Sequence, residues 1–394
     1  MLVVERKIQN WIEKNMFIIA FLYIFVAGTL IRIFLRNFLS WDAEYCLLPW
    51  YDEIKKNGAI LGLNMQVGDY NLLYQFIIAI FTYIPIKPLY VYKILSCIFD
   101  IALAFLGCGF TRELFGKENK SMHVAIFSLI YLSPIVYFNS ACWGQCDSIY
   151  TFFTLLTLYL ILKEHYSFAM CMYGIAFSFK FQAVFFLPFL FVFYFKNKKF
   201  SIFQFGYVPL MMILTAIPNL LNGRSVYDIF QVYFKQAEGS TDISKNYPSF
   251  WNIFNNAQRP EMLIPMRYMA ILFKSCILGL GIIWICKKKI LFSYKNVIWL
   301  SFLMTYACVL FLPAMHERYG FLYEILALII VLMDKKTVVF LIPMYICTFI
   351  TYSYCLFANQ YNSLVVSLVN VLAFISYIIY FIKNCDMDEN TNNI

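Results

Sequence analysis

The sequence predicts an all-α, polytopic membrane protein, and three observations lead to this fold class. The chain has 394 residues, of which 62% are hydrophobic and 13% charged, whereas soluble domains carry roughly 25% charged residues. Its mean hydropathy is +0.70. Apolar runs of about 15–22 residues recur along the chain, and ~20 residues cross a bilayer as a helix. We therefore expect a single domain over residues 1–394 with about 12 transmembrane helices, and interfacial helices in its first outer loop.

The basic residues indicate which loops share one side of the membrane. Short Lys/Arg clusters between apolar runs mark cytoplasmic loops. They lie at 6–14, 112–120, 163, 196–199, 287–289, 335–336 and 383. If all of them are inside, residues 37–88 form the first outer loop, 222–262 a long outer loop and 384–394 a polar cytoplasmic tail. The net charge of +9 is then a topology signal and gives no reason to expect nucleic-acid binding.

Two intervals fit this topology only with special elements. Between Arg6 and Arg112 there are three apolar runs, and we expect the shortest, 70–85, to lie on the outer surface as an interfacial helix. Between Lys163 and Lys196, a stretch of ~30 residues must cross twice, so each leg would reach only ~21 Å into a ~30 Å core. The turn between these legs would lie at membrane depth, which is tolerated where it lines a cavity.

The same topology collects conspicuous side chains at the outer face. They come from four segments: Asp42, Glu44, Asp69 and Tyr70; Trp143, Gln145 and Asp147; Lys180 and Gln182; and His316, Glu317, Arg318 and Tyr319. A charge at bilayer depth costs about 2.5–3.5 kcal/mol on insertion scales, so it needs a partner or a function. Acids, cations and aromatic rings in one cavity suit transfer chemistry on an anionic, lipid-linked substrate.

Several of these residues also have plain structural explanations. Trp143 fits an aromatic belt at the membrane interface, and Asp147 fits a cap on the helix that follows it. Lys180 could snorkel, although its depth in a short leg favours pairing with a partner or ligand. Glu317 and Arg318 could form a purely structural ion pair.

Two common catalytic motifs are missing from the sequence. His316-Glu317 begins an H-E-x-x-H zinc motif, but Gly320 stands where the second histidine is needed. There is also no G-x-x-x-x-G-K-[ST] loop for nucleotide phosphates. With three histidines in the chain, we expect no His-rich metal site and no certain cofactor, and the participation of a divalent cation stays open.

Four stretches in chain order resemble the GT-C glycosyltransferases. They are SWDAEYCLLPWYDEIKKNG with GDYNLLYQF, SPIVYFNSACWGQCDSIYTFF, FSFKFQAVFFLPF and FLPAMHERYGF. The chain resembles in particular the bacterial relatives of the second mannosyltransferase of GPI-anchor assembly, and more distantly the dolichyl-phosphate-glucose transferases of N-glycan assembly. The resemblance covers most of residues 40–320. It departs from the family after Asp69-Tyr70, where Asn71-Leu72-Leu73 replaces an often Pro-rich continuation.

The resemblance implies a multi-pass membrane enzyme that transfers a hexose, such as mannose or glucose, from a polyprenyl-phosphate donor to a glycan or lipid-linked acceptor. It implies one displacement with inversion, and it carries the general base over onto Asp42, with Glu44 as a substitute. Asp69, Asp147 and the Lys180–Gln182 pair match further family motifs. We expect a bacterial cytoplasmic membrane with the site facing outward.

Reaction chemistry assigns roles to these residues. An attacking hydroxyl must lose a proton to a carboxylate within hydrogen-bond reach, which is the role expected of Asp42. A departing polyprenyl phosphate gains negative charge that preorganised cations stabilise, and Arg318, Lys180 and His316 are the candidates. Glu317 would then orient Arg318.

Two alternatives remain from other classes. Broken helices and buried charges are equally at home in a lipid-linked sugar flippase or transporter. An O-acyltransferase could use His316, but that function leaves Asp42 and Asp69 unexplained.

Overall fold

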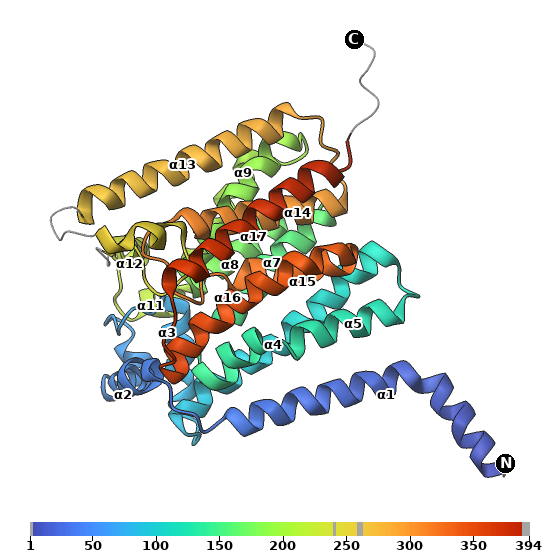
Figure 1. Ribbon diagram of the computed structural model, residues 1–394. Coiled ribbons are helices and arrows are strands. Elements are labelled where there is room, and N and C mark those ends of the chain that lie inside the picture. Colours follow the sequence, from blue (N-terminus) through green and yellow to red (C-terminus); the bar gives the residue numbers. More distant parts are fainter. Residues whose placement is uncertain (1–2, 239–241, 258–262, 388–394) are drawn as a thin grey trace.

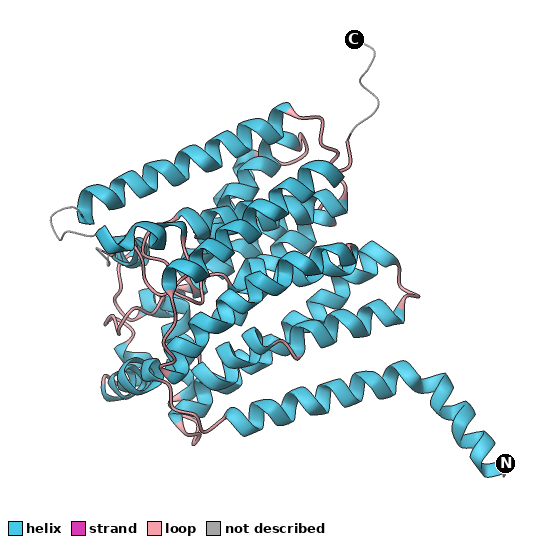
Figure 2. Cartoon of the chain, viewed as in Figure 1, coloured by secondary structure: helices cyan, strands magenta, loops and turns pink. Residues whose placement is uncertain are grey.

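The protein is a bundle of helices in a computed structural model that describes residues 3–238, 242–257 and 263–387 (Figures 1 and 2). The chain is 79% helical, and no strand occurs in the described ranges. The longer helices are α1 (Val3–Leu35), α4 (Pro88–Phe115), α5 (Lys120–Tyr131), α7 (Asp147–Leu162), α8 (Tyr166–Phe179), α9 (Leu187–Lys196), α13 (Leu263–Lys287), α14 (Tyr294–Phe311), α15 (Phe321–Met333), α16 (Val338–Phe357) and α17 (Ser363–Asn384).

Shorter elements connect or extend these helices. They are η1 (Ala43–Leu47), α2 (Leu48–Lys56), η2 (Ala59–Gly62), α3 (Leu72–Phe81), α6 (Pro134–Tyr137), η3 (Phe138–Trp143), η4 (Phe181–Phe186), η5 (Ile202–Gly206), α10 (Tyr207–Thr215), α11 (Ile217–Leu221), α12 (Val226–Glu238), η6 (Phe250–Ala257) and η8 (Lys335–Thr337). The first and the long outer loops therefore contain helices of their own. Parts of the predicted 222–262 loop and most of the 384–394 tail lie outside the described residues.

The helices establish a multi-pass membrane protein. In the described ranges, six helical segments are long and apolar enough to cross a membrane: α1, α4, α13, α14, η8 with α16, and α17. A seventh arises if α5 is continued through α6 and η3, across a bend of 43°. The remaining expected segments are helices of 10–17 residues, α3 among them. The count of about 12 crossings and the interfacial position of α3 stay predictions.

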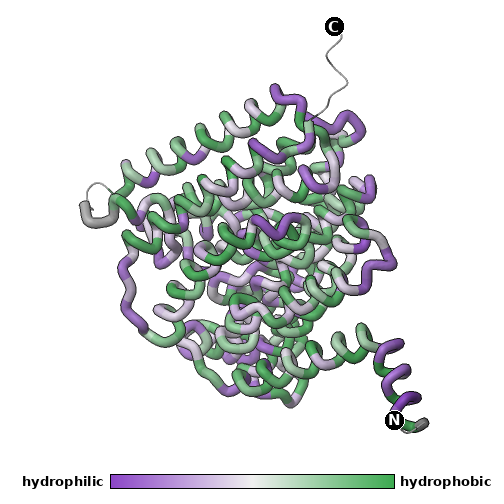
Figure 3. The backbone as a smooth tube through the Cα atoms, turned by 45° about the vertical axis from the view of Figure 1, so that its right-hand side comes forward, coloured by the Kyte–Doolittle hydropathy of each residue, from purple (hydrophilic) through white to green (hydrophobic). Residues whose placement is uncertain are grey.

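Two helices at the periphery show how the bundle depends on lipid. Only 11% of the apolar window of α1 is buried within the protein, and 17% of that of α13, against 89% for α14. Side chains such as Phe34 and Leu272 are largely exposed, by 86% and 67%. Apolar surface on this scale would be unfavourable in water. Figure 1 shows α1 and α13 at opposite edges of the bundle, and Figure 3 shows hydrophobic stretches along their lengths.

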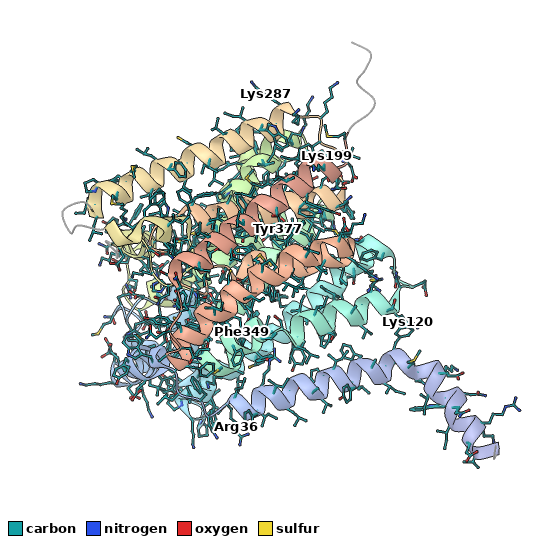
Figure 4. All side chains as sticks on the ribbon, in the orientation of Figure 1. Arg36, Lys120, Lys199, Lys287, Phe349 and Tyr377 are labelled. Atoms are coloured by element: carbon teal, nitrogen blue, oxygen red, sulfur yellow. The ribbon has the colours of Figure 1, made fainter. Side chains whose placement is uncertain are left out.

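Three of the basic clusters that we expected to share one side, at 112–120, 196–199 and 287–289, lie on the same side of the bundle. The Lys196 ammonium donates to the Lys288 carbonyl at 2.9 Å, which joins two of these loops. In Figure 4 the labelled residues Lys287, Lys199 and Lys120 follow one another from the top of the bundle down its right-hand side. Arg36, at the end of α1, lies at the opposite end. Which side of the membrane the basic end faces stays a prediction.

A buried ion pair attaches α1 to the rest of the protein. The Arg32 guanidinium donates to Asp100 Oδ2 through Nε at 3.0 Å and Nη2 at 2.8 Å, and the side chains are 6% and 0% exposed. Ser140 donates to the same oxygen at 2.5 Å, and Ser148 donates to Oδ1. Because these serines flank the turn at 144–146, Asp100 holds both ends of the segment that carries Trp143, Gln145 and Asp147.

Candidate functional site

Seven of the thirteen residues expected at the outer face meet in one group, the polar cluster: Asp42, Trp143, Gln145, Asp147, Lys180, Glu317 and Arg318. Asp42 lies at the entrance to η1 and is about a quarter exposed. Its Oδ2 accepts a hydrogen bond from Trp143 Nε1 at 3.0 Å and another from Gln145 Nε2 at 2.7 Å. Oδ1 accepts no hydrogen bond from the described residues. Two donors thus fix the carboxylate while one of its oxygens stays available.

Arg318 lies at the centre of the polar cluster. Its Nη1 donates to Glu317 Oε1 at 2.9 Å and lies 3.6 Å from Asp42 Oδ2. Its Nε lies 3.8 Å from Asp147 Oδ2 and makes no hydrogen bond within the described part of the chain. The guanidinium also stacks over the Trp143 ring at 5.5 Å. One planar cation therefore faces three carboxylates. Glu317 is its neighbour in sequence, and Asp42 and Asp147 come from two distant segments.

Asp147 has a second cationic partner. The Lys180 ammonium donates to Asp147 Oδ1 at 2.5 Å, and Asn139 Nδ2 donates to Oδ2 at 2.9 Å. Asp147 is fully buried and Lys180 is 15% exposed. Lys180 has extended backbone between α8 and η4, as expected for a break between two short legs. The break between α8 and η4 therefore places the Lys180 ammonium in the polar cluster.

Special backbone geometry shapes two of these segments. Gly144 adopts φ +81°, a left-handed conformation that suits glycine, and this turn follows directly after Trp143. Ala314 has φ +60°, and its amide donates to the Ile243 carbonyl at 2.9 Å. Such strain costs about 1–3 kcal/mol and persists where the surroundings impose it.

Both π-helical segments of the described chain border the polar cluster. η1 begins directly after Asp42, and η3 ends at Trp143. π-Helical turns are rare and occur frequently at functional sites. Ser40 connects the two segments, since its hydroxyl donates to the Trp143 carbonyl at 2.9 Å. The first outer loop and the second turn are thus positioned together.

The charges of the polar cluster do not cancel. Asp42, Asp147 and Glu317 face Arg318 and Lys180, which leaves one formal negative charge. Burial lowers the pKa of Arg318, but the three carboxylates outweigh it and raise that pKa above its ordinary range. Arg318 therefore keeps its positive charge.

His316 lies at the edge of this group and stays neutral. Its Nδ1 is 3.9 Å from Glu317 Oε2, and the side chain is one-third exposed. Burial, followed by the positive charges of Arg318, Lys245 and Lys180, lowers the pKa of His316 to about 3. The imidazole is therefore available as a neutral hydrogen-bonding group.

Other predicted site residues lie outside the polar cluster or at its rim. The Glu44 side chain is exposed and forms no hydrogen bond or ion pair with the described residues. Asp69 is exposed too, and only its backbone carbonyl is engaged, by Gln236 at 2.8 Å. Tyr70 is buried, and its hydroxyl donates to Tyr92 at 2.7 Å within a group of tyrosines. These three residues do not join Asp42 in direct contact.

The remaining pair, Gln182 and Tyr319, lies next to the polar cluster. The Gln182 side chain lies beside Tyr319, its Oε1 has no hydrogen-bond partner among the described residues, and the Tyr319 ring packs against Phe185. Arg318 lies 6.0 Å from the Tyr319 ring. Both residues therefore support the loop that carries Arg318.

The structure decides between several of the alternatives left by the sequence. Trp143 is 3% exposed, so it does not belong to an aromatic belt. Cys146 holds the N-cap position of α7, and the Asp147 carboxylate binds Asn139 and Lys180 side chains in place of capping the helix. Lys180 does not snorkel, because its ammonium is paired with Asp147.

Sequence reasoning missed two polar partners. Asn139 donates to Asp147 and also lies 3.3 Å from the Tyr352 hydroxyl, which comes from α16. The Tyr352 ring packs edge-on against Trp143 at 5.2 Å. Asn139 precedes the W-G-Q-x-D segment by only four residues, and this proximity is the one signal that could have identified it. Tyr352 carries no such signal.

Among the described residues, no group of three or more His, Cys, Asp or Glu is arranged to hold a metal ion. No protein-family model matches this chain, and no curated protein matches its sequence. The resemblance to GT-C enzymes thus remains a hypothesis based on the four motifs.

Proposed function

We propose that the protein is an integral membrane glycosyltransferase that moves a hexose from a polyprenyl-phosphate donor to a glycan or lipid-linked acceptor. One observation carries the proposal. Arg318 lies 3.6 Å from Asp42 and 3.8 Å from Asp147, which come from two other segments expected at one membrane face, and Lys180 from a third segment pairs with Asp147. Trp143 and Gln145 hold Asp42 with one carboxylate oxygen free. The motif resemblance supplies the donor class, and the face would be the outer one.

Asp42 has the features of a general base. Trp143 and Gln145 fix one oxygen, and Oδ1 can accept the proton of an acceptor hydroxyl as it attacks the anomeric carbon. The new glycosidic bond forms while the bond between the anomeric carbon and the phosphate oxygen breaks. The proton goes to Asp42, and the electron pair leaves with the polyprenyl phosphate. A single displacement of this kind inverts the sugar.

The departing phosphate needs positive charge, and Arg318 is the best placed cation. Its contacts to Asp42 and Asp147, at 3.6 and 3.8 Å, are too long for hydrogen bonds. The Arg318 Nη1 and Nε groups that face these carboxylates can therefore donate hydrogen bonds to a phosphate oxygen. Lys180 is engaged by Asp147 at 2.5 Å, so its main role in this scheme is to hold Asp147. Neutral His316 can donate one further hydrogen bond.

The two acids of the first outer loop provide the sharpest test. Purified protein in proteoliposomes is offered pooled polyprenyl-phosphate hexoses with candidate acceptors, and donor consumption is followed by mass spectrometry. Asp42→Asn should lower the transfer rate by about 10²–10⁴-fold, the usual contribution of a general base. Glu44→Gln is the matched control, because Glu44 stands two residues away without contacts, and it should keep near-normal transfer.

Three results would contradict the proposal. Near-normal transfer by correctly folded Asp42→Asn would exclude the base assignment, and loss only in Glu44→Gln would move that role to Glu44. Transbilayer movement of the donor without its consumption would identify a flippase instead. Thermal unfolding of each variant shows whether a loss of transfer reflects a loss of folding.

A further inference from the structure

A second site lies at the basic end of the bundle, far from the polar cluster. A cavity of about 610 Å³ opens between α1, α4, α5 and α7, a volume within the range of about 300–1,000 Å³ that ligand pockets occupy. It is lined by Phe21, Phe105, Cys108, Gly109, Arg112, Lys117, His123, Val124 and Tyr159. None of these residues belongs to the polar cluster.

The wall of this cavity is apolar toward the middle of the bundle. Phe21 of α1 and Phe105 of α4 pack with ring centroids 5.7 Å apart, and both contact Phe127 of α5, at 4.5 and 5.2 Å. Phe105 is nevertheless 51% exposed. Because α1 is so little covered by the protein, hydrocarbon must fill the space beside these rings when the protein is in a bilayer.

The mouth of the cavity is cationic. Arg112 is the last residue of α4 that lines the cavity, and Lys117 lines it from the turn after α4. The lining itself contains no acidic residue. Two acids lie beside this lining: Glu113 is paired with Lys163 at 2.6 Å and accepts a hydrogen bond from the lining residue Tyr159 at 3.4 Å, and Glu118 follows Lys117 in the turn. The basic residues Arg112, Lys117, Lys120 and Lys163 outnumber these two acids, so the mouth keeps a net positive charge. Figure 4 shows Lys120, the first residue of α5, at this same end of the bundle. Two exposed cations therefore lie at the polar end of an apolar groove.

His123 gives this mouth a fixed shape. Its Nδ1 lies 2.8 Å from the Thr111 hydroxyl, and its Nε2 lies 3.2 Å from the Lys117 carbonyl. Cys108 Sγ also donates to the His123 carbonyl at 3.3 Å. These bonds tie the turn between α4 and α5 to both helices, so the positions of Arg112 and Lys117 are constrained at the backbone.

We propose that this cavity binds an anionic phospholipid, with the phosphate headgroup at Arg112 and Lys117 and an acyl chain along Phe21 and Phe105. Basic pockets between membrane helices recognise such headgroups, and the apolar wall supplies the contact that a free anion cannot use. The lipid would fill the space between α1 and the bundle. This proposal does not depend on the glycosyltransferase activity.

The test uses full-length protein in a neutral detergent, with bound lipid counted by native mass spectrometry. Phosphatidylglycerol should bind more tightly than zwitterionic phosphatidylcholine. Arg112→Gln with Lys117→Gln should weaken phosphatidylglycerol binding about 25-fold, because each basic residue near an anionic headgroup contributes roughly a fivefold factor. The double variant Lys335→Gln with Lys336→Gln removes the same charge from another predicted inner loop, and it should change binding less than about twofold.

A second variant tests the apolar half of the site. Val124→Trp places a large ring in the cavity and should abolish phosphatidylglycerol binding while the thermal midpoint stays near that of the wild type. Equal binding of the two lipids would overturn the proposal, as would an equal loss in the Lys335/Lys336 control. Displacement of the lipid by millimolar inorganic phosphate would assign the site to a free anion instead.

Discussion

Replacing Asp100 with Asn should both destabilise the protein and disturb the candidate site. Asp100 is fully buried, and it accepts two hydrogen bonds from Arg32 and one from each of Ser140 and Ser148. Removing one partner of a buried pair costs about 3–5 kcal/mol, since an uncompensated charge remains. In the variant, Arg32 would still donate to the Gly28 and Tyr131 carbonyls and stack over the Tyr131 ring at 4.0 Å. The free energy of unfolding should therefore fall by about 3 kcal/mol, the lower end of this range.

The assay is thermal unfolding of purified protein in detergent. At about 2 °C per kcal/mol for a large chain, Asp100→Asn should lower the midpoint by about 6 °C. The double variant Arg32→Met with Asp100→Leu should recover at least half of this loss, because buried ion pairs can often be replaced by apolar residues. Glu164→Gln removes an exposed partner of Lys199 and should leave the midpoint nearly unchanged.

Two outcomes would refute this reasoning. If Asp100→Asn unfolds at the wild-type temperature, the Arg32–Asp100 pair does not hold α1 as described. If the double variant is as unstable as the sum of its single changes, the charge imbalance is not the cause of the loss. Transfer by Asp100→Asn should also fall at temperatures where the variant is folded, because Ser140 and Ser148 flank the turn of the polar cluster.

Three further predictions concern the loop at 312–320. Arg318→Lys should lower transfer by roughly 10²-fold, because one ammonium cannot replace a planar fork that faces three carboxylates; an equal loss of thermal stability would identify a structural pair instead. The folded pKa of His316 is lowered from 6.5 to about 3, so only the unfolded chain gains this proton between those pH values, and stability should fall as the pH drops below 6.5. His316→Gln should flatten that part of a plot of unfolding midpoint against pH, and identical plots would contradict the assignment. Gly320→Ala should lower the midpoint because its Cβ would lie 2.7 Å from Glu324 Oε1, whereas Gly279→Ala meets no atom within 4 Å and should raise it.

The sequence predicted the helices because hydrophobicity is a local property. Runs of apolar residues identify segments that must satisfy their backbone hydrogen bonds internally, and each expected segment is helical in the structure. Charge placement was equally informative. Three of the basic clusters lie on one side of the bundle, and seven of the conspicuous residues, from four segments, lie near one another.

Only the tertiary structure decided which of those residues touch. Asp42 binds Trp143 and Gln145 across more than 100 residues of sequence. The Glu44 side chain, two residues from Asp42, is exposed and forms no hydrogen bond or ion pair with the residues that the structure describes. An α-helical or π-helical turn rotates neighbouring side chains to different directions, so two acids of similar chemistry acquire different surroundings. The position of Arg318 among three carboxylates is likewise a property of the fold.

The sequence by itself indicated an all-α multi-pass membrane protein and named the chemical groups that supply the polar cluster. The tertiary structure decided their pairing, because the energy of a charge depends on burial and on distances of a few ångströms to partners far along the chain. It also brought in Asn139 and Tyr352, which pattern alone does not distinguish from other polar residues of apolar helices. Finally, it placed Arg112, Lys117 and His123 around a cavity beside α1. This arrangement depends on how α4, α5 and the turn between them pack against α1.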